Sequence, residues 1–177
     1  SSIGQYNTAA TPLQMAMVAS AVANDGKLMK PYMVDELEAS NLDPVEKTKP
    51  QEMSRPLSPQ NAQMLQSMME TVVEKGTGTN ARIPNVKVGG KTGTAQVVRL
   101  AVYKHLKEKD IPYEYRDHAW FTCFALAVNP EIVVTVLVEH GLHGGSASAP
   151  IAAKILNRYF ADKKAEPASK TDEPAGG

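Results

Sequence analysis

The chain has 177 residues, of which 42% are hydrophobic, and its 19 basic and 19 acidic residues cancel. This length and apolar fraction are sufficient for a buried core. The absence of net charge argues against a nucleic-acid-binding protein and against a basic membrane-surface protein. No apolar run reaches the length needed to span a bilayer, and we expect no signal peptide at the start.

The first predicted element is a helix over residues 12–24. Thr11 is a suitable N-cap, Pro12 favours the first helical position, and Gln14 can complete a capping box with Thr11. Gly26 is placed to end the helix. Because apolar residues occupy nearly every side of this segment, we expect the helix to be buried.

Residues 36–57 carry three prolines among charged residues and predict a surface excursion or a small ribbon. A second helix follows, with Ser58 as its cap, Pro59 at its start and Gly76 at its end. Its apolar residues recur at helical spacing and predict the buried face: Ala62, Leu65, Met68, Met69, Val72 and Val73.

Residues 76–79, Gly-Thr-Gly-Thr, predict a flexible turn that leads into a strand. That strand contains the segment Lys91-Thr92-Gly93-Thr94, which combines a cation, two hydroxyls and a glycine. On the edge of a sheet, alternate side chains and free backbone N–H groups would face a cleft, and Gly93 would let a substrate backbone approach. We therefore interpret residues 91–94 as a carboxylate-binding edge.

A phosphate-binding P-loop is the rival interpretation of Gly90-Lys91-Thr92. A P-loop requires a glycine five positions before Gly90, where this chain has Asn85. The residues that follow Thr92 also have the composition of a continuing strand rather than of a helix start. The sequence therefore favours the strand edge.

Residues 99–117 form a charged segment with tyrosines that is too polar for the core and long for a hairpin loop. Loops of this kind are often functional or mobile. We interpret His105 within it as a surface histidine rather than a ligand.

The apolar runs 119–128 and 132–138 predict two strands joined at residues 129–131. Neither run alternates cleanly between apolar and polar residues, so we expect burial on both faces and helices on both sides of the sheet. Cys123 lies in the first run and is the only cysteine. We interpret it as a small buried hydrophobe rather than a nucleophile, and it cannot form an intrachain disulfide.

A last helix is predicted to start near residues 148–150. It places six residues on one face: Ile151, Ala152, Ile155, Leu156, Tyr159 and Phe160. Residues 161–177 are rich in Ala, Lys, Glu, Pro, Ser and Gly and predict a disordered tail.

Three further groups of residues could have a chemical role. Residues 144–148 nearly match a Gly-x-Ser-x-Gly nucleophile elbow, but serine replaces the final glycine, so we predict a loop and an N-cap. His140 and His143 lack a Glu or Cys companion, which argues against zinc and favours a turn at the rim of the cleft. Asp117 and His118 could form a base and its orienting partner, or simply cap the entrance to a strand.

Residues 91–96 and their flanks resemble the third active-site motif of penicillin-binding proteins, the serine D,D-transpeptidases that crosslink peptidoglycan. Other blocks occur in the same order along the chain as in class B members of this family and resemble them. The last two of these blocks resemble the elongation-type enzyme, penicillin-binding protein 2. These blocks are Ser2-Ile3-Gly4-Gln5, Thr11-Pro12-Leu13-Gln14-Met15-Ala16, Ala23-Asn24-Asp25-Gly26-Lys27, Asp117-His118-Ala119-Trp120-Phe121 and His140-Gly141-Leu142-His143-Gly144-Gly145-Ser146. The resemblance covers roughly residues 1–160.

The resemblance implies an α/β fold of the α+β type, the penicillin-binding and β-lactamase-like transpeptidase fold, with an antiparallel central sheet and helices on both faces. It implies that residues 91–94 bind the substrate: Lys91, Thr92, Gly93 and Thr94. It also assigns the backbone N–H of Thr94 to the oxyanion hole. The family's Ser-x-x-Lys and Ser-x-Asn motifs do not occur in this sequence. Residues 1–160 are therefore expected to be the C-terminal portion of the domain, inactive without a serine supplied from outside the chain.

The same resemblance implies partners and a location. The ligands would be a peptidoglycan stem peptide and β-lactam antibiotics, with no cofactor and no metal. The protein partners would be the upstream part of the same domain and a membrane glycosyltransferase, at the periplasmic face of the bacterial inner membrane with the anchor upstream. Two alternatives stay open, namely a β-lactamase or penicillin-sensor domain and a noncatalytic interaction module of the same fold.

Overall fold

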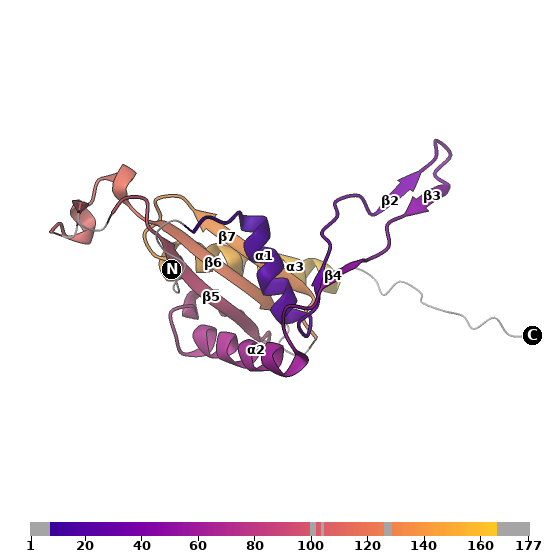
Figure 1. Cartoon of the computed structure of the whole chain (residues 1–177), viewed down its shortest axis with the longest axis horizontal. Coiled ribbons are helices and arrows are strands. Elements are labelled where there is room, and N and C mark those ends of the chain that lie inside the picture. Colours follow the sequence, from indigo (N-terminus) through magenta and orange to yellow (C-terminus); the bar gives the residue numbers. More distant parts are fainter. Residues whose placement is uncertain (1–7, 100–101, 104, 126–128, 166–177) are drawn as a thin grey trace, which may run out of the picture.

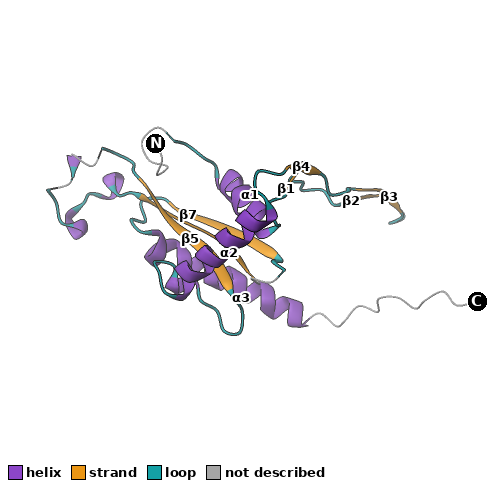
Figure 2. Cartoon of the chain, turned by 60° about the horizontal axis from the view of Figure 1, so that its bottom comes forward, coloured by secondary structure: helices purple, strands orange, loops and turns teal. Residues whose placement is uncertain are grey.

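The computed structural model describes residues 8–99, 102–103, 105–125 and 129–165. Within these ranges lies a three-stranded antiparallel sheet in the order β5 (Val88–Ala95), β6 (His118–Ala125) and β7 (Ile132–Val138). Figures 1 and 2 show helix α1 (Pro12–Ala23) on one face of the sheet and helix α3 (Ala149–Ala165) on the other. The predicted mixed fold, with helices on both faces of an antiparallel sheet, is confirmed.

Helix α1 begins with the predicted capping box. The Thr11 hydroxyl accepts a hydrogen bond from the Gln14 backbone N–H at 3.2 Å, and the Gln14 side-chain oxygen accepts one from the Thr11 N–H at 2.8 Å. The helix ends at Ala23, and Gly26 follows with a φ of +85°. A Cβ at Gly26 would stand 2.1 Å from the Leu57 carbonyl oxygen, so both the backbone angle and the space require glycine here.

Burial of α1 is confined to its C-terminal half. Ala19, Val22 and neighbouring residues are buried, whereas Leu13 and Val18 are both 58% exposed. The prediction of a helix buried on nearly all sides is therefore wrong for the described chain. The reason is that the strands and α2 pack against the end of α1 and leave its first turns uncovered.

Helix α2 (Pro59–Glu74) starts where predicted, with the Ser58 hydroxyl accepting a hydrogen bond from the Asn61 N–H. It ends two residues before Gly76. Its packing differs from the prediction, because Met68 is 58% exposed and Gln66 is buried in its place. The Gln66 amide donates a hydrogen bond to the Val22 carbonyl at 2.7 Å, which joins α2 to the end of α1.

The segment between α1 and α2 is the predicted small ribbon. Strand β1 (Leu28–Met29) pairs with β4 (Glu52–Ser54), and β2 (Glu36–Glu38) pairs with β3 (Pro44–Lys47), both antiparallel. Figure 1 shows the β2–β3 ribbon projecting away from the sheet.

No helix in the described ranges is both long and apolar enough to cross a membrane.

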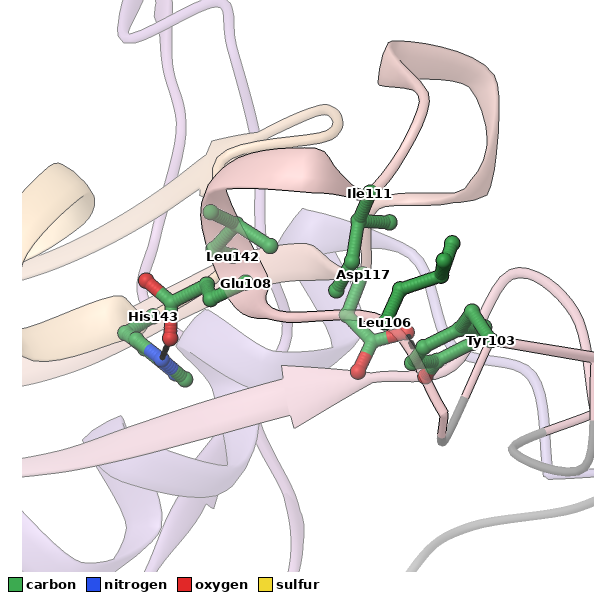
Figure 3. A pocket seen from close by; sticks show the side chains of 7 residues that line it. All are labelled: Tyr103, Leu106, Glu108, Ile111, Asp117, Leu142 and His143. Carbon is green, nitrogen blue, oxygen red and sulfur yellow. Dashed lines mark hydrogen bonds and ion pairs between the residues drawn. The ribbon is translucent and has the colours of Figure 1, made fainter.

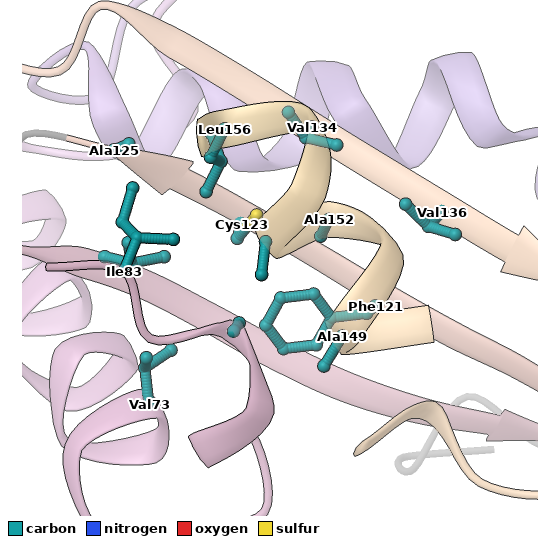
Figure 4. Close-up of a cluster of buried hydrophobic side chains, with 13 residues drawn as sticks. Val73, Ile83, Phe121, Cys123, Ala125, Val134, Val136, Ala149, Ala152 and Leu156 are labelled. Carbon is teal, nitrogen blue, oxygen red and sulfur yellow. The ribbon is translucent and has the colours of Figure 1, made fainter. Parts of the chain in front are cut away.

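Two hydrophobic clusters lie on the two faces of the sheet. The larger cluster, drawn in Figure 4, packs Phe121 and Cys123 of β6 against Leu156 of α3, all three fully buried. The smaller cluster packs Phe124 of β6 against Val22 and its neighbour at the end of α1. Because successive residues of a strand point to opposite faces, β6 feeds both clusters.

Glycines of β5 lie beneath two of these rings. A Cβ at Gly89 would stand 2.4 Å from Cζ of Phe124, and one at Gly90 would stand 2.6 Å from Cζ of Phe121. Each ring therefore occupies the space that a side chain on β5 would take. Glycine at these positions allows the aromatic side chains of β6 to fold across the neighbouring strand.

The turn before α3 differs from the predicted loop and N-cap. Residues Gly144–Ser148 form a short π-helical turn, η5, that continues directly into the helix. The Ser148 hydroxyl does not cap the helix. It is fully buried and donates a hydrogen bond to the Ala119 carbonyl of β6 at 2.9 Å, which anchors the turn to the sheet.

Helix α3 starts as predicted, but its expected apolar face divides in two. Ala152 and Leu156 are fully buried, whereas Ile151 and Ile155 are about 40% exposed. The helix continues through Ala165, so the prediction that the tail begins at residue 161 is wrong for residues 161–165. The remaining residues of the predicted tail, 166–177, lie outside the described ranges.

We expect Leu156→Ala to lower the free energy of unfolding by about 2–5 kcal/mol, because it removes a fully buried side chain from the larger cluster and leaves a cavity. The measurement is a urea titration followed by circular dichroism. The matched control is Ile155→Ala, next to it on the solvent side of the helix, which should cost less than about 1 kcal/mol. Equal losses for the two variants would contradict the assignment of Leu156 to the core.

Candidate functional site

Residues 91–94 lie on an open edge of the sheet. Among the described residues, strand β5 is the outer strand of the sheet and pairs only with β6, where Lys91 stands opposite Thr122 and Thr94 opposite Ala119. In an antiparallel pair, alternate backbone N–H groups of the outer strand point away from its partner. The edge therefore presents backbone N–H groups on its open side.

The side chains of this segment divide between the two faces of the sheet. Lys91 and Gly93 share a face with Thr122 and Trp120, their partners on β6, on the side of α1. Thr92 and Thr94 point to the opposite side. The two hydroxyls are thus adjacent on one face, and the lysine rises from the other.

A hollow of about 280 Å³ lies beside this edge. Its lining includes the whole candidate segment together with Trp120 and Thr122 of β6, and Met15 of α1. The wall across from β5 comes from the start of α1 and the residues before it, Thr8 and Ala10. The structure thus places all four predicted substrate-binding residues at one hollow: Lys91, Thr92, Gly93 and Thr94.

The Lys91 ammonium group folds back along the strand. Its Nζ donates a hydrogen bond to the Thr92 carbonyl oxygen at 2.7 Å, and the residue is exposed. The positive charge is therefore available at the edge without the cost of burying an ammonium group.

Thr92 has a partner that the sequence reasoning missed. Its hydroxyl oxygen lies 2.7 Å from that of Thr77, in the connection between α2 and β5. The sequence predicts only a flexible turn at residues 76–79, and nothing in its periodicity points to a contact across 15 positions. The return of the chain from α2 to β5 brings the two threonines together.

Turn η5 supports the same edge from behind. A Cβ at Gly144 would stand 1.9 Å from the Trp120 carbonyl oxygen and 3.0 Å from that of Gly93. A Cβ at Gly145 would stand 2.3 Å from the Thr77 carbonyl oxygen. The turn, the candidate segment and the α2–β5 connection therefore converge at backbone-to-backbone distance, which only glycine permits.

A second hollow, of about 440 Å³, lies where the β5–β6 connection meets the start of β6 (Figure 3). Tyr103 and Ile111 are buried there, so the expectation that residues 99–117 are too polar for the core is wrong for these two. The Tyr103 hydroxyl donates a hydrogen bond to Asp117 at 2.9 Å. Burial, together with this carboxylate, raises the pKa of Tyr103 to about 12.

The histidines near this hollow make structural contacts. The His118 Nδ1 accepts a hydrogen bond from the His140 backbone N–H at 2.9 Å, and Asp117 bonds Tyr103 rather than His118. Asp117 and His118 are therefore not a base with its orienting partner. His143 contacts Glu108 at 2.9 Å and joins the turn before η5 to the β5–β6 connection. Among the residues that the structure describes, no three His, Cys, Asp or Glu side chains are grouped as a metal site.

Cys123 is confirmed as a buried member of the larger cluster. Burial raises the pKa of its thiol to about 12. Since the thiolate is the nucleophilic form, a buried thiol with a raised pKa is a poor nucleophile near neutral pH.

Residues 1–157 match the family described as the penicillin binding protein transpeptidase domain. The chain is 39% identical over 161 residues to peptidoglycan D,D-transpeptidase PbpA of Mycolicibacterium smegmatis, covering 88% of this chain and 30% of that protein. It is 35% identical over 163 residues to peptidoglycan D,D-transpeptidase MrdA of Haemophilus influenzae, covering 89% of this chain and 25% of that protein.

The fold is also similar to solved structures. Penicillin-binding protein A from M. tuberculosis, solved as a ceftriaxone acyl-enzyme complex, superposes with a TM-score of 0.75 at 35% identity, covering 88% of this chain and 34% of that one. The chain therefore spans about a quarter to a third of the length of the curated relatives it matches. The block Ser2-Ile3-Gly4-Gln5, part of the predicted resemblance, lies outside the described residues.

We expect Cys123 to resist alkylation in the folded protein. The side chain is fully buried and burial raises its pKa to about 12, so little thiolate forms at pH 8, whereas an unfolded cysteine is substantially ionised at that pH. Labelling with iodoacetamide at pH 8, followed by mass spectrometry, should be more than about 100-fold slower in buffer than in 6 M guanidinium chloride. Similar rates in the two conditions would show that the thiol is accessible.

Proposed function

Because the chain belongs to the penicillin-binding protein transpeptidase family, we propose that it supplies the substrate-carboxylate edge of a peptidoglycan D,D-transpeptidase. The observation that carries this proposal is the placement of Lys91, Thr92 and Thr94 together on an open strand edge that lines a hollow. The curated relatives with that activity in their names support it.

The chemistry of the edge suits a D-Ala-D-Ala stem peptide. Such a peptide ends in a carboxylate close to the carbonyl carbon that must be attacked. Lys91 raises the positive potential at the edge, and the hydroxyls of Thr92 and Thr94 can donate hydrogen bonds to the carboxylate. Hydrogen bonds to an ionised group are roughly twice as strong as those between neutral groups. This segment therefore binds and orients the acyl donor.

The backbone N–H of Thr94 is proposed as one of two oxyanion-hole donors. The second donor would come from the residue that carries the nucleophile. In a comparable hydrolase, the loss of one such donor costs about 2.7–4 kcal/mol of transition-state stabilisation. Gly93 contributes by leaving the approach to this N–H free of a side chain.

The nucleophile is proposed to be a serine outside this chain, since no Ser-x-x-Lys motif occurs in the 177 residues. The serine oxygen attacks the penultimate D-Ala carbonyl, the peptide C–N bond breaks, and the terminal D-Ala leaves with a proton. An amine nitrogen of a second stem peptide then attacks the ester, forms the crosslink and releases the serine. The chain thus contributes binding and polarisation, and its partner supplies the covalent chemistry.

β-Lactams are proposed as inhibitors of the same site. They present a carboxylate close to a strained carbonyl, which is the pattern that residues 91–94 would recognise. The acyl-enzyme complex of the structurally similar M. tuberculosis protein supports this proposal. By resemblance to the elongation-type enzymes, we also propose a membrane glycosyltransferase as partner and the periplasmic face of the inner membrane as location.

In the complete domain, Lys91→Ala should slow acylation by benzylpenicillin by roughly 10- to 100-fold, the worth of a hydrogen bond or ion contact to a charged group. The measurement is the second-order acylation rate. Lys87→Ala is the matched control, because Lys87 is an exposed lysine just before β5 and should leave the rate unchanged. Unchanged kinetics for Lys91→Ala would remove Lys91 from the site.

Intact-mass spectrometry after exposure to benzylpenicillin locates the nucleophile. We expect no adduct on residues 1–177 alone, and a single adduct on the serine-bearing part when that part is present. An adduct within residues 1–177 would show that a serine of this chain is the nucleophile and would contradict the proposal. Rapid loss of the adduct with hydrolysed penicillin would instead indicate a β-lactamase.

A further inference from the structure

We propose that Thr77 is a positioning residue of this site, whose hydroxyl donates a hydrogen bond to Thr92 and thereby directs the Thr92 proton toward the substrate carboxylate. The inference rests on the proposed function of residues 91–94. It adds a residue from outside the strand motif, 15 positions earlier in the chain.

The two hydroxyl oxygens are 2.7 Å apart, the usual length of an O–H···O hydrogen bond. Each hydroxyl carries one proton and can accept two hydrogen bonds. The oxygen positions alone allow either threonine to be the donor. The ligand removes this ambiguity.

A carboxylate is ionised at neutral pH and can only accept hydrogen bonds. Thr92 must therefore use its single proton on the carboxylate when substrate is bound. The Thr77–Thr92 bond can then persist only if Thr77 is the donor. The result is a directed chain from Thr77 to Thr92 to the carboxylate, in which each bond polarises the next.

Thr77 is held in place by its neighbours. The N–H groups of Gly76 and Gly78 both donate to the Val72 carbonyl at the end of α2, at 3.1 and 3.0 Å. The Thr77 carbonyl packs against Gly145 of turn η5. The backbone around Thr77 is therefore fixed at both sides, and its hydroxyl has a defined position relative to Thr92.

The residues that follow Thr77 are also held to turn η5. The Asn80 amide donates a hydrogen bond to the Gly145 carbonyl at 2.8 Å, which links the residues after Thr77 to η5. A Cβ at Gly145 would stand 3.7 Å from the Thr92 methyl carbon, so η5 lies beside the Thr92 side chain. The Thr92 side chain thus has the Thr77 hydroxyl as its hydrogen-bond partner, in a junction that η5 holds from the other side.

A role confined to stability does not account for this contact. Thr77 is exposed, so water could satisfy its hydroxyl if Thr92 were absent. The contribution of an exposed hydroxyl pair to the free energy of folding is small. Its specific effect is to fix the rotor of the Thr92 hydroxyl.

The test uses the complete transpeptidase domain with this segment in place. Acylation rates are measured for the unaltered protein, Thr77→Val and Thr77→Ser, with benzylpenicillin and with its methyl ester, which lacks the carboxylate. Thr77→Val should slow acylation by the free acid by roughly 3- to 10-fold, the effect of one hydrogen bond, and Thr77→Ser should restore the rate. The methyl ester should react equally with both variants.

Thr79→Val is the matched control, because in the described part of the chain the Thr79 hydroxyl has no hydrogen-bond partner. It should react at the unaltered rate with both compounds. An equal slowing of the acid and the ester by Thr77→Val would overturn the positioning role and indicate a general structural defect.

A double-mutant cycle gives the second measurement. If Thr77 acts through Thr92, Thr77→Val should have no further effect in a Thr92→Val background. Independent, additive effects would overturn the inference, while the slow acylation of Lys91→Ala would still support the proposed function. Failure of the unaltered domain to react with benzylpenicillin would overturn both.

Discussion

Phe124 and Phe121 of β6 fold over Gly89 and Gly90 of β5 from opposite faces of the sheet, and much of the structure depends on this contact. The rings need the glycines, because any side chain on β5 would take their space. With the rings in place, β6 supplies a core to α1 on one side and to α3 on the other. In the pairing register between β5 and β6, residues 91–94 lie on the open edge of the same strand, β5.

Features set by local chemistry could be predicted from the sequence. The capping box of Thr11 and Gln14 and the Ser58 cap act over three residues, so their helices start where expected. The unbroken apolar runs of β6 and β7 correctly predict a sheet covered on both faces. Burial of individual side chains was harder to predict. Leu13 of α1 and Met68 of α2 are apolar but exposed, since burial depends on which elements pack against each helix.

The candidate site likewise has residues that could be predicted from the sequence and residues that could not. Lys91, Thr92, Gly93 and Thr94 are adjacent in sequence, and a strand edge presents them together whatever the rest of the fold does. Thr77 reaches the site only through the path of the chain from α2 to β5, which no periodicity encodes. Tyr103 is buried with its hydroxyl donating a hydrogen bond to the Asp117 carboxylate, and this pairing likewise requires the three-dimensional structure.

Turn η5 has a consequence for how this sequence can change over evolutionary time. A side chain at Gly144 would collide with the carbonyl of Trp120, and one at Gly145 with that of Thr77. These carbonyls are backbone atoms, so no compensating substitution at Trp120 or Thr77 can make room. Variation beside the edge must therefore come from side chains around these two positions, and selection for altered ligand preference has few routes through the turn itself.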